Sequence, residues 1–199
     1  MRGKMFVISG PSGAGKSTVV AELLNKKREV ALSISATTRG KRAGEEEGVN
    51  YYYKSRDEFE EMIKNNEFLE WAKYCDNYYG TPKKPVEKVL DEGKDIILEI
   101  EIQGAMQVKK NFPESIFIFI APPSYETLVS RLKNRGTETE EVVNKRINTA
   151  LSELKFAKEY DYILVNDVLS DTVDNAISII KAEAFKKDRV INDLKIFND

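Results

Sequence analysis

Apolar and polar positions alternate along the chain in blocks that predict strands followed by helices. Short, mostly apolar runs predict buried strands at about 4–9, 95–102, 116–121 and 162–165. Apolar residues at helical spacing predict helices at about 16–27 and 83–92, from near Ser124, and at about 171–186. Apolar strands that alternate with helices indicate a parallel sheet with both faces covered. The pattern therefore predicts an α/β fold with three layers, α/β/α, around a central parallel sheet.

Two stretches interrupt this alternation. Residues 33–82 are polar and aromatic, with short β-like runs and a helix opened by a capping box at Ser55, and they predict a small inserted lobe. Residues 131–150 are basic around a glycine hinge, with a second helix opened by Thr137 or Thr139, and they predict part of a mobile lid. We assign the chain to one domain, 1–199, with its core at about 1–32, 83–123 and 151–199, the lobe at about 33–82 and the lid at about 124–150.

Composition limits the functions that need to be considered. Hydrophobic residues make up 41% and charged residues 32% of the chain, which is typical of a folded globular protein. No apolar run approaches the roughly 20 residues that span a bilayer, and the net charge of −2 argues against a nucleic-acid partner. The single cysteine, Cys75, cannot form an internal disulfide, and no signal-peptide pattern is present, so we expect a cytoplasmic protein. The absence of histidine excludes a histidine general base but leaves phosphoryl transfer open.

The segment Gly-Pro-Ser-Gly-Ala-Gly-Lys-Ser-Thr at 10–18 lies between a predicted strand and a predicted helix. Its glycines let the backbone turn so that N–H groups point inward around an anion. Lys16 can reach the β- and γ-phosphates of a nucleotide, and the Ser17 hydroxyl can ligate Mg²⁺. An ordinary glycine-rich turn is the alternative, but the flanking strand and helix favour a nucleoside triphosphate site.

Two glutamates interrupt one of the predicted strands. Glu99 and Glu101 lie two residues apart in Leu-Glu-Ile-Glu-Ile, so a strand would place them on the same face. Buried carboxylates need a charge partner or a metal, and the carboxyl ends of strands are where open α/β sheets bind ligands. We predict that one glutamate lies near Mg²⁺ and the other near the acceptor. A solvated edge strand is the alternative.

Arginines gather in both stretches that interrupt the alternation. Arg39 and Arg42 lie three residues apart beside several hydroxyl groups, and guanidinium groups bind phosphate oxygens in pairs. Arg131 and Arg135 share a helix face, and Arg146 lies beside the apolar stripe of the next helix. Arginines on a lid can neutralise charge on a transferring phosphoryl group. In isolation, each of these residues is also compatible with a solvated loop or helix surface.

Together these motifs resemble the guanylate kinase family of P-loop nucleoside monophosphate kinases along nearly the whole chain. The matching pieces are Gly10–Thr18, Ser35–Arg39, Arg42, Asn50–Tyr51, Phe68–Ala72, Asn77–Thr81, Glu99–Gly104, Arg135–Glu141, Asn144–Arg146 and Val165–Asp167. The phosphate loop is shared by many nucleotide-binding proteins, whereas the pieces at 35–39, 68–72 and 135–141 are far more specific. The resemblance implies a P-loop NTPase fold whose inserted lobe binds GMP. It also implies transfer of the ATP γ-phosphoryl group to GMP or dGMP, with Mg²⁺ bound together with ATP, by a monomer or homodimer.

The resemblance further implies roles for individual residues. The implied ATP-binding residues are Gly10, Pro11, Ser12, Gly13, Ala14, Gly15, Lys16, Ser17, Thr18, Asn166 and Asp167. The implied GMP-binding residues are Ser35, Arg39, Arg42, Tyr51 and Tyr79 for the phosphate, together with Glu70, Thr81, Glu99 and Glu101. The implied catalytic residues are Lys16, Arg39, Arg131, Arg135 and Arg146, and the implied metal ligands are Ser17 and Glu101.

The guanine ring would be recognised by two of these residues. Glu70 would accept hydrogen bonds from N1–H and the 2-amino group, and Thr81 would donate to O6. Adenine presents the opposite pattern, so AMP would leave a buried carboxylate unpaired. Some family members carry aspartates where this chain has Glu99 and Glu101, and the longer side chains leave open which carboxylate is nearer the metal. Thr81 replaces a serine of some relatives and keeps the hydroxyl.

Two other functions remain to be weighed. The first is a kinase for another phosphorylated acceptor, against which Glu70 and Thr81 argue. The second is a phosphopeptide-binding module, since guanylate-kinase-like domains also serve in scaffolding proteins. Such modules usually have damaged phosphate loops, whereas Lys16 and Ser17 are intact here. A panel of acceptors distinguishes the first alternative, and a nucleotide-binding assay distinguishes the second.

Overall fold

A five-stranded parallel sheet forms the centre of the protein. The computed structural model describes residues 1–133 and 139–191. The strand order is β2-β7-β1-β8-β9, and every neighbouring pair is parallel. The strands are β1 (Met5–Ser9), β2 (Ala31–Leu32), β7 (Ile96–Glu99), β8 (Ile116–Ala121) and β9 (Tyr162–Val165). Because β1 lies in the middle of this order, the loop that follows it emerges at the centre of the sheet's carboxyl edge.

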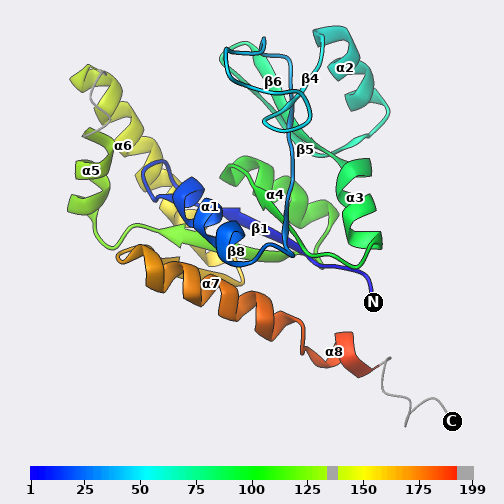
Figure 1. The fold of residues 1–199 in the computed structure, drawn as a ribbon. Helices are drawn as coiled ribbons and strands as arrows, with labels where there is room; N and C mark the ends of the chain where they lie inside the picture. The colour runs from blue at the N-terminus through cyan, green and yellow to red at the C-terminus, as the bar shows by residue number, and fades with distance from the viewer. Residues whose placement is uncertain (134–138, 192–199) are drawn as a thin grey trace, which may run out of the picture.

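Helices cover both faces of this sheet, as Figure 1 shows. One face packs against α1 (Lys16–Lys26) and α7 (Leu169–Glu183), whose apolar side chains join those of β1 and β8. The other face packs against α3 (Lys83–Asp91) and α4 (Ile102–Asn111). A 3-10 turn (Lys155–Glu159) precedes β9, and a short helix, α8 (Lys187–Val190), follows α7. The predicted three-layer α/β fold is confirmed.

One predicted strand is shorter than the sequence suggested. Strand β7 ends at Glu99, and Glu101 is the residue that precedes the first turn of α4. The prediction that one strand carries both glutamates on the same face is therefore wrong. The reason is visible in the next residues, because Ile102, Ala105 and Val108 are buried at helical spacing against the sheet. Their pattern favours a helix, which the glutamate-isoleucine alternation before it obscured.

The inserted region builds a second sheet, which stands above the core in Figure 1. Its strand order is β4-β3-β6-β5, formed by β3 (Ala36–Thr37), β4 (Tyr52–Tyr53), β5 (Phe68–Tyr74) and β6 (Asn77–Pro82). The helix α2 (Arg56–Lys64) begins at the predicted capping box, in which Ser55 and Glu58 exchange hydrogen bonds. Phe59 of α2 stacks between Phe68 and Tyr78, with ring centroids 4.3 and 5.3 Å away. This aromatic contact fixes the helix on the small sheet.

Two helices extend from the core on the other side of the phosphate loop, at the upper left of Figure 1. They are α5 (Tyr125–Lys133) and α6 (Glu140–Leu154), and α6 begins after Thr139, one of the two predicted starts. Their contact is apolar and consists mainly of Leu128, Leu132, Val143, Ile147 and Ala150. Arg135, one of the predicted catalytic residues, lies outside the described residues. Among the described residues, no helix has both the length and the apolar character needed to span a bilayer.

Candidate active site

The phosphate loop is shaped by glycines whose surroundings leave no space for a side chain. Gly15 has a φ of 87° and is the residue from which α1 begins. A Cβ there would lie 2.4 Å from Nδ2 of Asn166, and that buried amide donates to the carbonyl of Ala14 at 2.8 Å. Gly13, with a φ of 86°, would meet the side chains of Leu128 and Leu132 at 3.1 Å. The loop is therefore held between the end of β9 and helix α5.

Lys16 lies close over this loop. Its ammonium group donates to the carbonyl of Gly10 at 2.5 Å and to that of Pro11 at 3.4 Å. The first turn of α1 carries no acidic residue, so its free N–H groups face the loop without a competing carboxylate from the same turn. Backbone N–H groups, a helix N-terminus and an ammonium group thus converge where an anion can bind.

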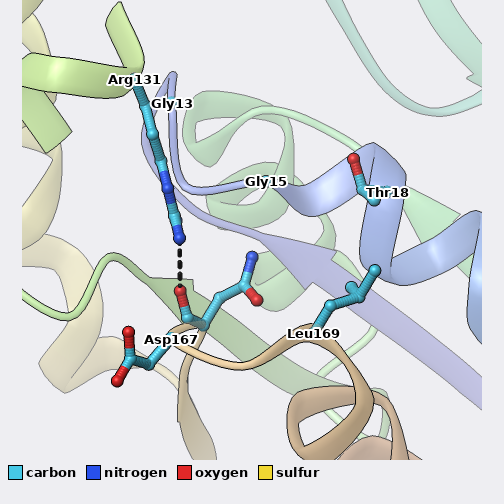
Figure 2. A pocket seen from close by; sticks show the side chains of 7 residues that line it. Gly13, Gly15, Thr18, Arg131, Asp167 and Leu169 are labelled. Carbon is cyan, nitrogen blue, oxygen red and sulfur yellow. Dashed lines mark hydrogen bonds between the residues drawn. The ribbon is translucent and has the colours of Figure 1, made fainter. Parts of the chain in front are cut away.

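A cavity of about 300 Å³ opens beside the loop. Its lining residues are Gly13, Gly15, Thr18, Arg131, Asn166, Asp167 and Leu169. Figure 2 shows Arg131 extending from α5 toward the turn after β9, where its Nη2 donates to the carbonyl of Asn166 at 3.0 Å. Its Nη1 is buried and has no hydrogen-bond partner within residues 1–133 and 139–191. A buried guanidinium N–H without a partner is unfavourable, so an anionic ligand here would satisfy it.

Sequence reasoning predicted most of this cavity and missed Leu169. Asn166 and Asp167, which the resemblance places near adenine, both line this cavity. Leu169, the first residue of α7, adds an apolar side chain to the lining of the cavity. A signal was available in the sequence, because Leu169 follows the predicted strand at 162–165, and open α/β sheets bind ligands beyond the carboxyl ends of their strands.

An acidic residue of the core contacts the phosphate loop. The hydroxyl of Ser17 donates to Oε1 of Glu99 at 2.5 Å. Strand pairing explains this, because Glu99 lies opposite Ile8 in the register of β1 and β7, at the carboxyl edge of the sheet. Hydroxyl and carboxylate oxygens are the ligands that Mg²⁺ prefers, and the ion usually takes few protein ligands and completes its shell with water and phosphate. Ser17 and Glu99 supply one oxygen of each of these two kinds. Among the described residues, no group of three His, Cys, Asp or Glu side chains could hold a metal ion by itself.

The second glutamate is oriented differently. Glu101 is exposed, and its charge acts on Glu70 of the inserted lobe, where it helps to raise the pKa of that carboxyl. Glu99 is hydrogen-bonded to the phosphate loop, whereas Glu101 acts through its charge on Glu70 and on Glu153 of α6, whose pKa it also helps to raise. The structure brings Glu99, rather than the predicted Glu101, to the Ser17 hydroxyl.

The two residues predicted to recognise guanine lie together in the lobe. Glu70 is only 7% exposed, Thr81 is fully buried, and the two are paired across β5 and β6. The Thr81 hydroxyl donates to Oε1 of Glu70 at 2.7 Å. Burial raises the pKa of Glu70, and the hydrogen bonds from Thr81 oppose that rise. Thr81 thus fixes Oε1 of the Glu70 carboxylate, and the Thr81 hydroxyl does not bind Oε2.

The predicted phosphate-binding arginine of the lobe is held by an ion pair. Arg39 donates through Nη2 and Nη1 to the two oxygens of Glu45, at 2.7 and 3.1 Å, and its guanidinium lies 5.3 Å from the ring centre of Tyr51. The ring of Tyr51 is in turn 6.2 Å from that of Tyr79. These three predicted residues therefore form one cluster. Ser35 directly precedes β3, and its carbonyl accepts from the N–H of Tyr52 at 2.9 Å.

Glu45 is a residue of this cluster that sequence reasoning missed. It also accepts from the backbone N–H of Arg42 at 2.8 Å and from the hydroxyl of Tyr53 at 2.7 Å. The hydrogen bond from Arg39, with those from Arg42 and Tyr53, lowers the pKa of Glu45 to about 2. The sequence carries no signal for it, since Glu45 is one of three consecutive glutamates in a loop without periodicity.

Helix α6 delivers a further arginine to the phosphate loop. Nη2 of Arg146 donates to the hydroxyl of Ser12 at 2.9 Å. Of the predicted catalytic residues, Lys16 and Arg146 contact the loop itself and Arg131 lines the cavity beside it. Arg39 lies in the inserted lobe, on the predicted acceptor side.

Comparisons with known proteins agree with this arrangement. The family model described as guanylate kinase matches residues 2–183. The chain is 53% identical to a guanylate kinase of Desulfitobacterium hafniense over 181 residues, which cover 91% of this chain and 90% of that protein. It is 52% identical to a guanylate kinase of Halalkalibacterium halodurans, with 96% and 93% covered. A crystal structure of guanylate kinase from Anaplasma phagocytophilum superposes with a TM-score of 0.74 at 34% identity, covering 94% of this chain and 89% of that one.

Proposed function

From its membership of the guanylate kinase family, we infer that this chain transfers the γ-phosphoryl group of ATP to GMP and releases ADP and GDP. The observation that carries the choice of acceptor is the buried pair of Glu70 and Thr81. A phosphate loop is common to many nucleotide-binding proteins, whereas this pair offers guanine a carboxylate and a hydroxyl in one buried place. We extend the proposal to dGMP, because none of the lobe contacts described here calls for a ribose 2′-hydroxyl.

The donor side of the proposed reaction is the phosphate loop. The loop N–H groups, the N-terminus of α1 and Lys16 would bind the phosphates of ATP. Nη1 of Arg131, which has no hydrogen-bond partner in the described part of the chain, and the guanidinium of Arg146 lie beside the loop, where they would stabilise negative charge on the transferring group. Asn166 and Asp167 would border the adenine ring in the adjoining cavity. Arg135 is proposed as a further member of this group from the resemblance alone.

The acceptor side of the proposed reaction is the inserted lobe. Ser35, Arg39, Arg42, Tyr51 and Tyr79 would hold the phosphate of GMP, with Arg39 kept in place by Glu45. Glu70 would accept from N1–H and the 2-amino group. The single proton of the Thr81 hydroxyl is donated to Glu70, so in this arrangement Thr81 holds the carboxylate in place, and the hydrogen bond to O6 implied by the resemblance would require that hydroxyl to turn away from it. The phosphate of GMP is an anion at neutral pH and can attack the γ-phosphorus directly. No general base is then required, which agrees with the absence of histidine from the chain.

The residues at the loop also fit a magnesium ion. Ser17 and Glu99 offer the hydroxyl and carboxylate oxygens that such an ion takes, and they are already in contact. When bound, Mg²⁺ would neutralise charge on the β- and γ-phosphates. We propose Ser17 as its direct protein ligand and Glu99 as the carboxylate that orients Ser17 or a water of the ion. Glu101 is proposed for the acceptor side from the resemblance, which places it among the GMP-binding residues.

A panel of acceptors tests the proposed function. With Mg-ATP, we expect formation of ADP to depend on GMP or dGMP and to be far slower with AMP, UMP or dTMP. Equal or faster turnover of one of the latter three would overturn the choice of guanine. A phosphopeptide-binding module would bind ATP poorly, so direct measurement of ATP binding separates that alternative. Sedimentation of the same preparation would decide between a monomer and a homodimer.

A further inference from the structure

Helix α4 covers the edge of the inserted sheet next to Glu70. Strand β5 is an edge strand of that sheet, and its Trp71 follows Glu70 directly. The side-chain amide of Gln107 pairs with both backbone groups of Trp71: the N–H of Trp71 donates to Oε1 at 3.2 Å, and Nε2 donates to the carbonyl at 2.9 Å. Gln107 therefore takes the place of a neighbouring strand at this one position. These two hydrogen bonds attach the backbone of Trp71, the residue after Glu70, to helix α4 of the core.

A glycine of the same helix leaves the space that the Glu70 side chain occupies. Gly104 lies three residues before Gln107, so the two share one face of α4. A Cβ at Gly104 would lie 2.6 Å from Oε2 of Glu70, 3.1 Å from Cδ and 3.3 Å from Cγ. Oε2 is the carboxylate oxygen that Thr81 does not bind. The missing side chain of Gly104 therefore determines where the second oxygen can lie.

The backbone itself does not require a glycine at this position. Gly104 lies inside the first turns of α4, and its φ is outside the positive range that favours glycine. Alanine at such a position stabilises a helix relative to glycine. A substitution here is thus expected to displace a buried carboxylate without unfolding the helix.

We propose that Gly104 and Gln107 are positioning residues that determine the acceptor specificity by fixing the carboxylate of Glu70. The proposal rests on the proposed function, because it takes Glu70 as the group that recognises guanine. Gln107 fixes the backbone beside Glu70, Thr81 fixes one oxygen, and Gly104 leaves room for the other. A purine with both an N1–H and a 2-amino group matches a carboxylate held in this way. A purine without the 2-amino group leaves one oxygen unpaired.

The test compares GMP with inosine monophosphate, which differs from GMP only by lacking the 2-amino group. For Gly104→Ala, we expect kcat/KM for GMP to fall about tenfold or more, and that for inosine monophosphate to fall less. Dissociation constants for the two nucleotides should change in the same proportion, while the KM for ATP and the Tm stay as in the wild type. Gln107→Met, which removes both hydrogen bonds to Trp71, should lower the GMP preference less. The exposed Lys110→Ala, on the same helix, is the matched control and should leave the preference unchanged.

Glu70→Gln separates failure of this inference from failure of the proposed function. If Glu70→Gln leaves the preference for GMP unchanged, Glu70 does not recognise guanine and the proposed function of that residue is wrong. If Glu70→Gln removes the preference while Gly104→Ala keeps it, the role assigned to Gly104 is wrong. Equal losses for both nucleotides in Gly104→Ala would also overturn it. In the double variant, Gly104→Ala should cause no further loss of preference, because both changes act on the same carboxylate.

Discussion

The phosphate loop and the inserted lobe are both suited to bind anions, but they are built differently. The loop is one continuous segment, and its shape is set by glycines packed against Asn166 and α5. The lobe uses side chains from separate strands and loops, and these hold one another in pairs, Arg39 with Glu45 and Glu70 with Thr81. A site made of backbone groups is disrupted by a change in the shape of the loop. A site made of paired side chains is disrupted when either partner of a pair is replaced.

The largest expected effect is at the donor side. Replacing Lys16 by methionine removes the ammonium group over the loop while keeping a side chain of similar length. We expect kcat to fall about 1000-fold with GMP and with dGMP alike, because the lost charge stabilises the transferring group rather than the acceptor. Steady-state kinetics with both acceptors measure this, and titration with GMP should show unchanged affinity. A loss confined to one acceptor would contradict the division into donor and acceptor regions.

The next effect concerns the shape of the loop. Gly15→Ala places a Cβ at a φ of 87° and 2.4 Å from the amide of Asn166. An alanine in the left-handed region is unfavourable by about 1–2 kcal/mol before any clash, so we expect the KM for ATP to rise about tenfold or more. Gly40→Ala is the matched control, because that Cβ would meet nothing within 4 Å, and the KM for ATP should stay close to the wild-type value. Similar ATP kinetics in both variants would show that the loop is less constrained than its contacts indicate.

A smaller effect is expected in the lobe. Glu45→Gln keeps the size of the side chain but removes the charge that holds Arg39 and accepts from Tyr53. Because Arg39 then loses its fixed orientation, we expect the KM for GMP to rise about tenfold, which equals about 1.4 kcal/mol of binding free energy. The KM for ATP should be unaffected. Binding of guanosine, which lacks the phosphate, provides the control: an equal loss of guanosine affinity would indicate general damage to the lobe.

The smallest effect is a dependence of stability on pH. Ion pairing lowers the pKa of Glu45 to about 2 in the folded protein, below its ordinary value of 4.5. The stabilisation from Glu45 is therefore fully present above pH 4.5 and is lost as the pH falls toward 2. The difference in Tm between the wild type and Glu45→Gln should be largest near neutral pH and should shrink through this window. A difference that is constant with pH would mean that the charge of Glu45 contributes nothing to folding.

Local sequence patterns predicted those parts of the protein whose geometry depends on residues that are close together in the sequence. The loop at 10–18, the capping box at Ser55 and the apolar strands of the core could be recognised because each is defined within a few residues. The helix α4 was missed, since the glutamates before it imitate a strand. Glu45 was missed because its partners, the side chains of Arg39 and Tyr53 and the N–H of Arg42, converge on it only once the loop is folded.

The segment from Glu99 to Gln107 shows where the limit lies. Sequence alone determined that two carboxylates lie near the carboxyl end of a strand of the α/β sheet, because the spacing of apolar and acidic residues carries that information. Tertiary structure decided that Glu99 contacts Ser17, that Glu101 acts on Glu70, and that Gly104 adjoins the carboxylate of Glu70. These interactions join residues far apart in the chain. The pairing of β1 with β7 places Glu99 beside Ser17, and the packing of α4 against β5 places Gly104 beside Glu70. Local motifs therefore identify the chemical groups of the site, whereas tertiary packing determines where each carboxylate points.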